Sequence, residues 1–273
     1  MAGYETIEVS KADGVAWVTL NRPEVRNAVN EQMQRELHEV WTAFRYDDEV
    51  RCVVLTGAGQ SFCTGIDRAE AVSEDNNASM AAGDYPGYPT PWMYDDPGRD
   101  LGPKMCDLWK PVIAAVQGIA CGGAFYLLGE VDVIIASDDA TFFDPHVTYG
   151  MAAVFESVHM LQRMPLGEVL RMQLTGAYER VSAQRAYEIG LVSEVVGRDE
   201  LASAAERLAR VIASQPALAV QATLRTIWAA QDVPRRQALD ASVALVAAGN
   251  TPEALAEGQT FFESGKRVDW RLR

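Results

Sequence analysis

Short apolar runs alternate with segments of helical spacing along the first 198 residues. Strands are predicted at 4–10, 15–20, 52–56, 112–116, 131–136 and 191–196. From Asn30 to about Asp47, apolar side chains recur every three or four positions, which predicts an amphipathic helix. Strands that alternate with helices are typical of an α/β core.

The pattern changes after residue 198, where the chain becomes Ala-rich and amphipathic. Its spacing predicts helices at 199–214, 215–230, 234–248 and 252–264. A tail made only of helices is often an assembly element. We therefore predict a core over residues 1–198 and a helical oligomerisation region over residues 199–273.

Residues 73–104 interrupt the core with repeated prolines and Pro-Gly pairs among several aromatic residues. A long irregular segment inside a compact domain is usually functional, as active-site lids are. We interpret the segment as a lid, with a passive insertion as the alternative.

Composition narrows the class of protein further. The net charge of −14 argues against a nucleic-acid or anionic membrane partner, and no apolar run is long enough to cross a bilayer. The N-terminus shows no basic and apolar signal pattern, and the four cysteines show no metal-binding spacing. We expect free buried thiols, no metal and a cytoplasmic location. On so acidic a chain, an anionic ligand must be held by a few local cations.

Two glycine-rich turns carry the clearest chemical signal. Residues 57–67 and residues 118–124 each follow an apolar strand and precede a helical pattern. Such a pair can place two backbone N–H groups around one carbonyl oxygen, forming an oxyanion hole. Glycines at 65, 122 and 123 permit close approach and unusual φ angles. Packing glycines in two tight turns are the alternative interpretation.

With its motifs taken in order, the chain resembles the crotonase (enoyl-CoA hydratase/isomerase) superfamily. The motifs are Leu20-Asn21-Arg22-Pro23 through Ala28, Phe62 to Asp67, Lys110 to Gly118, Gly122-Gly123, and Ala186 to Val196. The resemblance implies an α/β fold, a crotonase-like spiral of ββα units with a C-terminal helical trimerisation region. It also implies a homotrimer or a dimer of trimers.

The resemblance further implies an acyl-CoA thioester substrate, whose carbonyl sits between the N–H groups of Ile66 and Gly123. Coenzyme A is then part of the substrate, and no other cofactor is expected. Substrate contacts are implied for Ala28, Cys63, Gly65, Asp67, Gly122 and the cations Arg22, Arg26, Arg68 and Lys266. For each cation, a solvated surface charge is the alternative, and helix-end stabilisation also explains Asp67.

Two positions depart from the family pattern. Hydratases of this family use two glutamates, and here those positions hold Tyr126 and His146. Tyrosine, with an ordinary pKa of about 10, would be a poor base, whereas histidine, with a pKa near 6.5, can act as acid or base. Asp144 lies two residues before His146 in a segment expected to be extended, so it could orient the imidazole. Glu156 is the rival partner, although a carboxylate on the helix surface is the favoured interpretation for it.

Three further polar residues are assigned structural roles. His38 and His159 lie in helical patterns, and Glu130 lies one helical turn beyond the family glutamate position, where we expect it to pair within the fold.

Three functions remain open from the sequence. The first is an acyl-CoA-processing enzyme that forms a thioester enolate, with His146 transferring protons. The second is a hydrolase of a thioester or of a β-diketone C–C bond, with a His146–Asp144 pair activating water. The third is a non-catalytic homologue that binds CoA. The aromatic segment from Tyr85 to Tyr94 favours a bulky acyl group.

Overall fold

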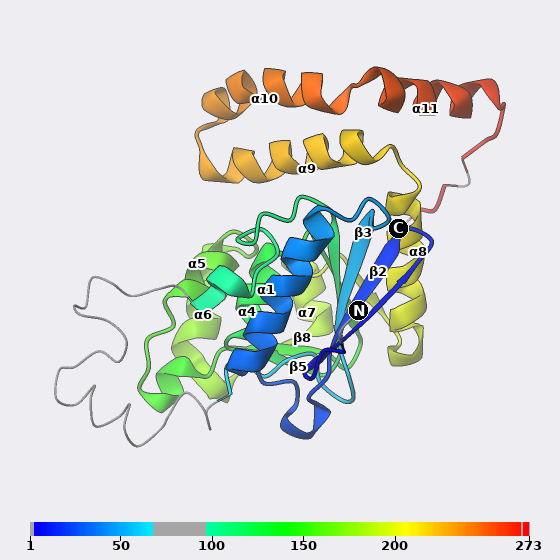
Figure 1. Cartoon of the computed structure of the whole chain (residues 1–273). Coiled ribbons are helices and arrows are strands. Elements are labelled where there is room, and N and C mark those ends of the chain that lie inside the picture. The colour runs from blue at the N-terminus through cyan, green and yellow to red at the C-terminus, as the bar shows by residue number, and fades with distance from the viewer. Residues whose placement is uncertain (1–2, 68–96, 269, 273) are drawn as a thin grey trace.

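The computed structural model describes residues 3–67, 97–268 and 270–272, which fold around two sheets (Figure 1). The larger sheet has the order β1 (Ile7–Ala12), β2 (Val15–Leu20), β3 (Cys52–Gly57), β4 (Val112–Val116), β6 (Val133–Ser137) and β9 (Glu194–Val196). The smaller sheet has the order β5 (Ile119–Cys121), β7 (Thr141–Phe143) and β8 (Val181–Ser182). The pairs β1–β2 and β7–β8 are antiparallel and the others are parallel. The predicted α/β architecture is confirmed.

Helices cover both faces of the larger sheet. On one face α1 (Glu31–Arg45) buries Leu37 and Trp41 in the main core. Asn30 caps this helix, because its side chain accepts a hydrogen bond from the Met33 N–H at 3.0 Å. On the other face, alanines of α8 (Leu201–Ala213) pack against strand residues and form a second apolar cluster with them. The remaining core helices are α4 (Ala124–Glu130), α5 (Phe155–Leu161), α6 (Leu166–Thr175) and α7 (Ala183–Glu188).

The strand beginnings differ from the predicted ones for local reasons. β1 begins at Ile7 because the N–H groups of Glu5 and Thr6 donate to the Glu36 carboxylate of α1, at 2.8 and 2.9 Å. β6 begins at Val133 because the Val131 N–H closes α4 by donating to the Leu127 carbonyl at 3.2 Å. At the starts of β1 and β6, hydrogen bonds to a helix therefore replace the first hydrogen bonds between strands.

The four helices of the tail begin and end within two residues of the predicted bounds. After α8 come α9 (Ala217–Asp232), α10 (Arg235–Gly249) and α11 (Pro252–Glu263). Figure 1 shows α9 over the core, with α10 and α11 as the outermost layer. Trp228 of α9 donates from its Nε1 to Asp132 Oδ1 at 2.7 Å, which fixes α9 to the core. Of the tail helices, α8 packs on strands β2, β3, β4 and β6 of the larger sheet.

Residues 73–96 of the predicted lid lie outside the described residues. The segment that follows, 97–104, is anchored, since Leu101 is fully buried and its carbonyl accepts a 2.8 Å hydrogen bond from Trp41 Nε1. The four cysteines are free and buried, as predicted. Burial raises the pKa of each thiol to about 12. Within the described part of the chain, no helix is both long and apolar enough to span a membrane.

Candidate active site

The two glycine turns are joined by a short backbone ladder. Phe62 N–H donates to the Gln117 carbonyl at 2.8 Å, and Cys63 N–H donates to the Ile119 carbonyl at 3.1 Å. Cys121 N–H then donates back to the Cys63 carbonyl at 3.1 Å. These bonds hold the ends of the two turns against each other, although more than fifty residues separate them along the chain.

Glycine allows the turns to meet at backbone distance. A Cβ atom at Gly65, where φ is +89°, would lie 2.8 Å from the Gly123 amide nitrogen. A Cβ atom at Gly123 would lie 3.0 Å from the Ile66 amide nitrogen. Among the described residues, neither the Ile66 nor the Gly123 N–H has a hydrogen-bond acceptor. Two adjacent free donors are therefore available to one oxygen atom.

A third segment holds the first turn in place. Val29 N–H donates to the Gly65 carbonyl at 2.8 Å, and Asp67 N–H donates to the Val29 carbonyl at 2.7 Å. The Arg22 guanidinium bonds Asp67 Oδ2 at 2.9 Å and the Ala28 carbonyl at 2.7 Å, with its side chain only 17% exposed. In this conformation the Arg22–Asp67 ion pair stabilises the first turn by joining its end to the segment that contains Ala28.

The other predicted ligand-binding residues are distributed less tightly. Cys63 is buried, and its sulfur accepts from the Gly65 N–H at 3.4 Å. Arg26 is exposed in a left-handed conformation beside the first turn, with φ of +55°. Lys266 is exposed beyond α11, and Arg68 lies outside the described residues.

His146 and Asp144 meet as predicted, but through a different local structure. His146 Nδ1 lies 2.5 Å from Asp144 Oδ1, and the His146 N–H donates to the same oxygen at 3.0 Å. The expected extended segment is wrong: Pro145 is helical, with φ of −86° and ψ of −1°, and His146 begins a 3-10 turn. Asp144 thus accepts hydrogen bonds from both the main chain and the ring of His146.

Glu156 is not the surface carboxylate that the sequence favoured. It is buried on α5, and its Oε1 lies 3.5 Å from His146 Nε2. Its burial, though not its contact with His146, agrees with the helical spacing, because Glu156, Met160 and Met164 recur every fourth residue and all three are buried. Asp144 and Glu156 therefore do not compete, since each faces a different nitrogen of the imidazole.

Tyr126 of α4 completes this cluster. It is buried, its ring lies edge-on to His159 at 6.0 Å between centroids, and its side chain hydrogen-bonds to Glu156. Burial raises the pKa of Glu156 above its ordinary value. The hydrogen bond from Asp144 raises the pKa of His146, and the negative charge of Glu156 adds to that effect. The donor atoms of Asp144, His146 and Glu156 all lie within 4.8 Å of one another.

The cluster adjoins the two free N–H donors. Gly122 has φ of +55°, and a Cβ atom there would lie 3.7 Å from His146 Cε1. Because Gly123 follows directly, the imidazole and the backbone donors border the same space.

Comparison with known proteins decides the family. Residues 10–272 match the profile of the enoyl-CoA hydratase/isomerase family. The chain belongs to that family. It is 38% identical to (E)-benzylidenesuccinyl-CoA hydratase of Thauera aromatica over 84% of each chain. It is 36% identical to 1,2-epoxyphenylacetyl-CoA isomerase of Escherichia coli over 74% of each chain.

Solved structures of the family share the whole fold. An enoyl-CoA hydratase/isomerase from Mycobacterium paratuberculosis superposes with a TM-score of 0.84, at 34% identity, over 99% of both chains. The predicted crotonase fold is thereby confirmed, as is the expectation that the chain is an enzyme of the hydratase/isomerase type.

Within this hydratase/isomerase fold, the remaining polar residues predicted to be structural have other partners. Glu130 accepts hydrogen bonds from the N–H groups of Lys104 and Met105, both at 2.8 Å, so it pairs within the fold as predicted. His38 is half-exposed on α1 and faces Asp100 at 3.0 Å. His146 is therefore the histidine that borders the two turns.

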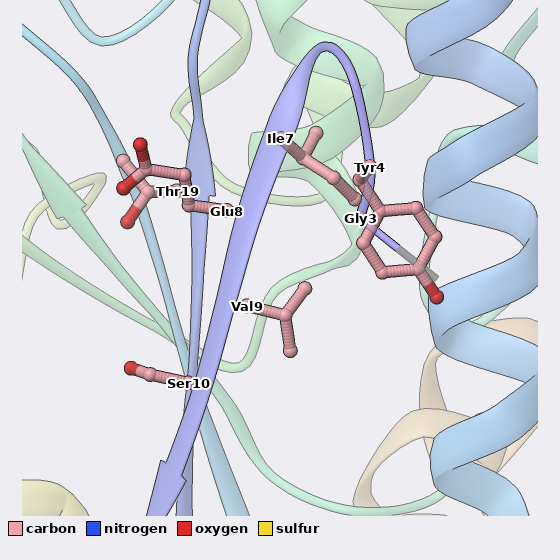
Figure 2. Close-up of a pocket in the computed structure, with 7 residues that line it drawn as sticks. All are labelled: Gly3, Tyr4, Ile7, Glu8, Val9, Ser10 and Thr19. Atoms are coloured by element: carbon pink, nitrogen blue, oxygen red, sulfur yellow. The ribbon is translucent and has the colours of Figure 1, made fainter. Parts of the chain in front are cut away.

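A separate surface pocket of about 450 Å³ lies beside the edge strand β1 (Figure 2). In Figure 2, Glu8 and Ser10 lie on one side of the strand and Val9 on the other, as the alternation of a strand requires. The pocket is lined by Gly3, Tyr4, Ile7, Glu8, Val9, Ser10 and Thr19. None of these residues belongs to the candidate active site, so we assign the pocket no catalytic role.

The contact with Asp144 gives a first testable expectation. In Asp144→Asn, the pKa of His146 should fall, because the carboxylate that stabilises the imidazolium is the main cause of its raised value. With the folded-state pKa raised above about 6.5, this contact stabilises the fold fully below that pH. The stabilisation is lost as the pH rises through the folded-state pKa. Ring 13C NMR titration of the three histidines measures the shift, and an unchanged pKa would refute the role of Asp144.

Proposed function

We propose that this enzyme acts on an acyl-CoA thioester through an enolate. The Ile66 and Gly123 N–H groups hold the thioester oxygen, and His146 transfers protons. The observation that carries the proposal is the position of the His146 ring against Gly122, beside the two free backbone donors. Addition of water to a 2-enoyl-CoA is the reaction that we assign, since several relatives are named hydratases.

The geometry supports each step of this chemistry. Negative charge moves onto the thioester oxygen when water attacks the β-carbon, and two preorganised N–H donors stabilise that charge most in the transition state. The carboxylate of Asp144 accepts from Nδ1, which leaves Nε2 of His146 to exchange protons with the substrate. Only protons and water are transferred, so the proposal includes no cofactor besides the CoA of the substrate.

The acyl group proposed is bulky rather than short. Two relatives that match most of the chain are named for substrates that carry a phenyl ring, benzylidenesuccinyl-CoA and epoxyphenylacetyl-CoA. The aromatic segment from Tyr85 to Tyr94, which also favours a bulky acyl group, lies outside the described residues. A phenyl-substituted substrate such as trans-cinnamoyl-CoA is therefore the first to test, with crotonyl-CoA as its short counterpart.

One assay separates the candidate functions. The purified protein is incubated with each thioester while loss of the enoyl chromophore, hydrated product and free CoA are followed. We expect hydrated product, faster from cinnamoyl-CoA than from crotonyl-CoA. Free CoA without hydration would instead indicate the hydrolase, which the 2.5 Å contact between His146 and Asp144 also suits. Binding of both thioesters with no turnover of either would indicate a CoA-binding homologue.

We also propose that α9–α11 form the interface of a homotrimer, alone or paired into a hexamer, in the cytoplasm. Their exposed apolar side chains are Leu218, Ile227, Leu239, Val243, Val246, Leu255, Phe261 and Phe262. So many apolar side chains on adjacent helices are typical of a covered surface rather than a solvated one.

The interface gives an expectation of its own. Val243→Asp combined with Leu239→Asp should convert the oligomer to monomers, because each charge would lose its hydration in an apolar contact. Light scattering after gel filtration measures the mass. Val211→Asp, on the exposed face of α8, is the control that should keep the native mass. A wild-type monomer would contradict the proposal.

A further inference from the structure

We propose that Glu156 is the second acid–base group of the site, exchanging one proton with His146, and that Tyr126 orients it. This inference rests on the proposed function, because it supplies the second proton carrier that hydration requires. Neither family glutamate is present, yet a carboxylate from a different helix reaches the same imidazole.

The geometry gives the two carboxylates different roles. Asp144 Oδ1 lies 2.5 Å from His146 Nδ1 and accepts a hydrogen bond from the His146 backbone N–H at 3.0 Å. Asp144 therefore fixes the orientation of the imidazole ring. Glu156 lies 3.5 Å from Nε2, which is beyond an ordinary N–H···O hydrogen bond of 2.7–3.2 Å. A reacting water can contact both Nε2 and Oε1 at that separation. Glu156 is thus placed to exchange a proton rather than to bind one permanently.

Glu156 is also buried in a way that suits a proton carrier. Its side chain is 4% exposed, against 19% for His146, and the Tyr126 side chain hydrogen-bonds to it from α4. Burial disfavours its ionised form, whereas the charge of His146 and the hydrogen bond from Tyr126 favour it. Among the described residues, the charged and titratable groups that face His146 and Glu156 are Asp144, Tyr126 and each other. Both pKa values are raised, so each group of the pair binds a proton more readily than its free side chain does.

The proposed step balances. The pair begins as imidazolium and carboxylate. Glu156 takes a proton from water, whose oxygen bonds to the β-carbon, while the electron pair of the double bond moves into the enolate. The Nε2–H of His146 then protonates the α-carbon, which gives the 3-hydroxyacyl thioester. The proton on Glu156 passes to Nε2 and restores the starting state. For the reverse dehydration, the same transfers run backwards.

The test is Glu156→Gln, assayed with trans-cinnamoyl-CoA across pH. In the wild type, the rate should fall at low pH as Glu156 becomes protonated and at high pH as His146 loses its proton. Glu156→Gln should lower kcat by about 10²–10⁴-fold, the usual contribution of a general acid or base, and abolish the low-pH limb. His146→Ala should abolish the high-pH limb. Tyr126→Phe should move the low-pH limb to higher pH, because the lost hydrogen bond stabilised the ionised carboxylate of Glu156.

The controls keep this proposal distinct from the proposed function. Glu168→Gln, a carboxylate on α6 paired with Arg185, should leave the profile unchanged. The His146 ring in Glu156→Gln should titrate at a lower pKa by 13C NMR, which also shows that the variant is folded. If His146→Ala loses activity but Glu156→Gln keeps its rate and both limbs, only the role of Glu156 is overturned. If His146→Ala retains full activity, the proposed function itself fails.

A metal ion is the rival occupant of the cluster, because the three donors lie close enough to share one. Dialysis of the wild-type protein against EDTA should leave its activity unchanged. Loss of activity that Zn²⁺ or Mn²⁺ restores would overturn the proton-exchange proposal.

Discussion

His146→Ala should reduce kcat for hydration of trans-cinnamoyl-CoA by about 10²–10⁴-fold, the range expected when a general acid or base is removed. Among the described residues, the imidazole is the side chain that borders both the backbone donors and the buried carboxylates, and its removal takes away the proposed proton carrier. KM should change little, because the two N–H donors and the CoA contacts remain. Steady-state kinetics at several pH values measures the effect.

His38→Ala is the matched control for this variant. His38 also faces a carboxylate, Asp100 at 3.0 Å, but it lies half-exposed on α1. Its removal should leave kcat within about twofold of the wild type, since surface substitutions away from special features have small effects. Equal losses in the two variants, or no loss in either, would contradict the role of His146.

Gly65→Ala should reduce kcat by about 10²–10³-fold, as removal of one oxyanion donor does. The added Cβ would lie 2.8 Å from the Gly123 nitrogen and 3.0 Å from the Cys121 carbonyl oxygen. One of the two turns must therefore move, which separates the donors on Ile66 and Gly123. The loss should appear in kcat, since the oxygen carries most charge in the transition state.

The control for Gly65→Ala is Gly190→Ala. The two glycines have nearly equal φ angles, +89° and +85°, so alanine is strained by backbone conformation at both. A Cβ atom at Gly190 meets nothing within 4 Å, whereas at Gly65 it meets backbone atoms of the second turn. Both variants should melt at lower temperature, but only Gly65→Ala should lose turnover. Similar kinetics in both variants would show that the turn geometry is unimportant.

The sequence predicted the larger sheet far better than the smaller one. Five of its six strands have five or six residues, long enough for their pattern to be read. The sixth, β9, has three residues and forms the end of the longer segment predicted at 191–196. β5, β7 and β8 have three, three and two residues, too few to show a period. Yet β5 is the strand that the Cys63 segment joins, so the part of the fold that aligns the turns was the least visible in advance.

The site was predicted in part for the same reason. The two turns and the replacement of the glutamates could be read from local sequence, and Asp144 lay within two residues of His146. The turn that brings Asp144 to His146 requires a helical conformation at Pro145. The residues next to Pro145 in the sequence do not determine that conformation. Glu156 reaches His146 only through the packing of α5 against α4, where a Cβ at Gly129 would lie 2.5 Å from that of His159. Such close helix contacts are tertiary and leave little local signal.

Exchange of α-protons tests the central claim most directly. Incubation of 3-phenylpropanoyl-CoA with the wild-type protein in D₂O, followed by mass spectrometry, reports enolate formation without any addition of water. We expect deuterium at the α-carbon with the wild type and far slower incorporation with His146→Ala and Gly65→Ala. Binding of this thioester by the wild type without deuterium incorporation, or equal incorporation by all three proteins, would contradict an enolate held by Ile66 and Gly123 and formed by His146.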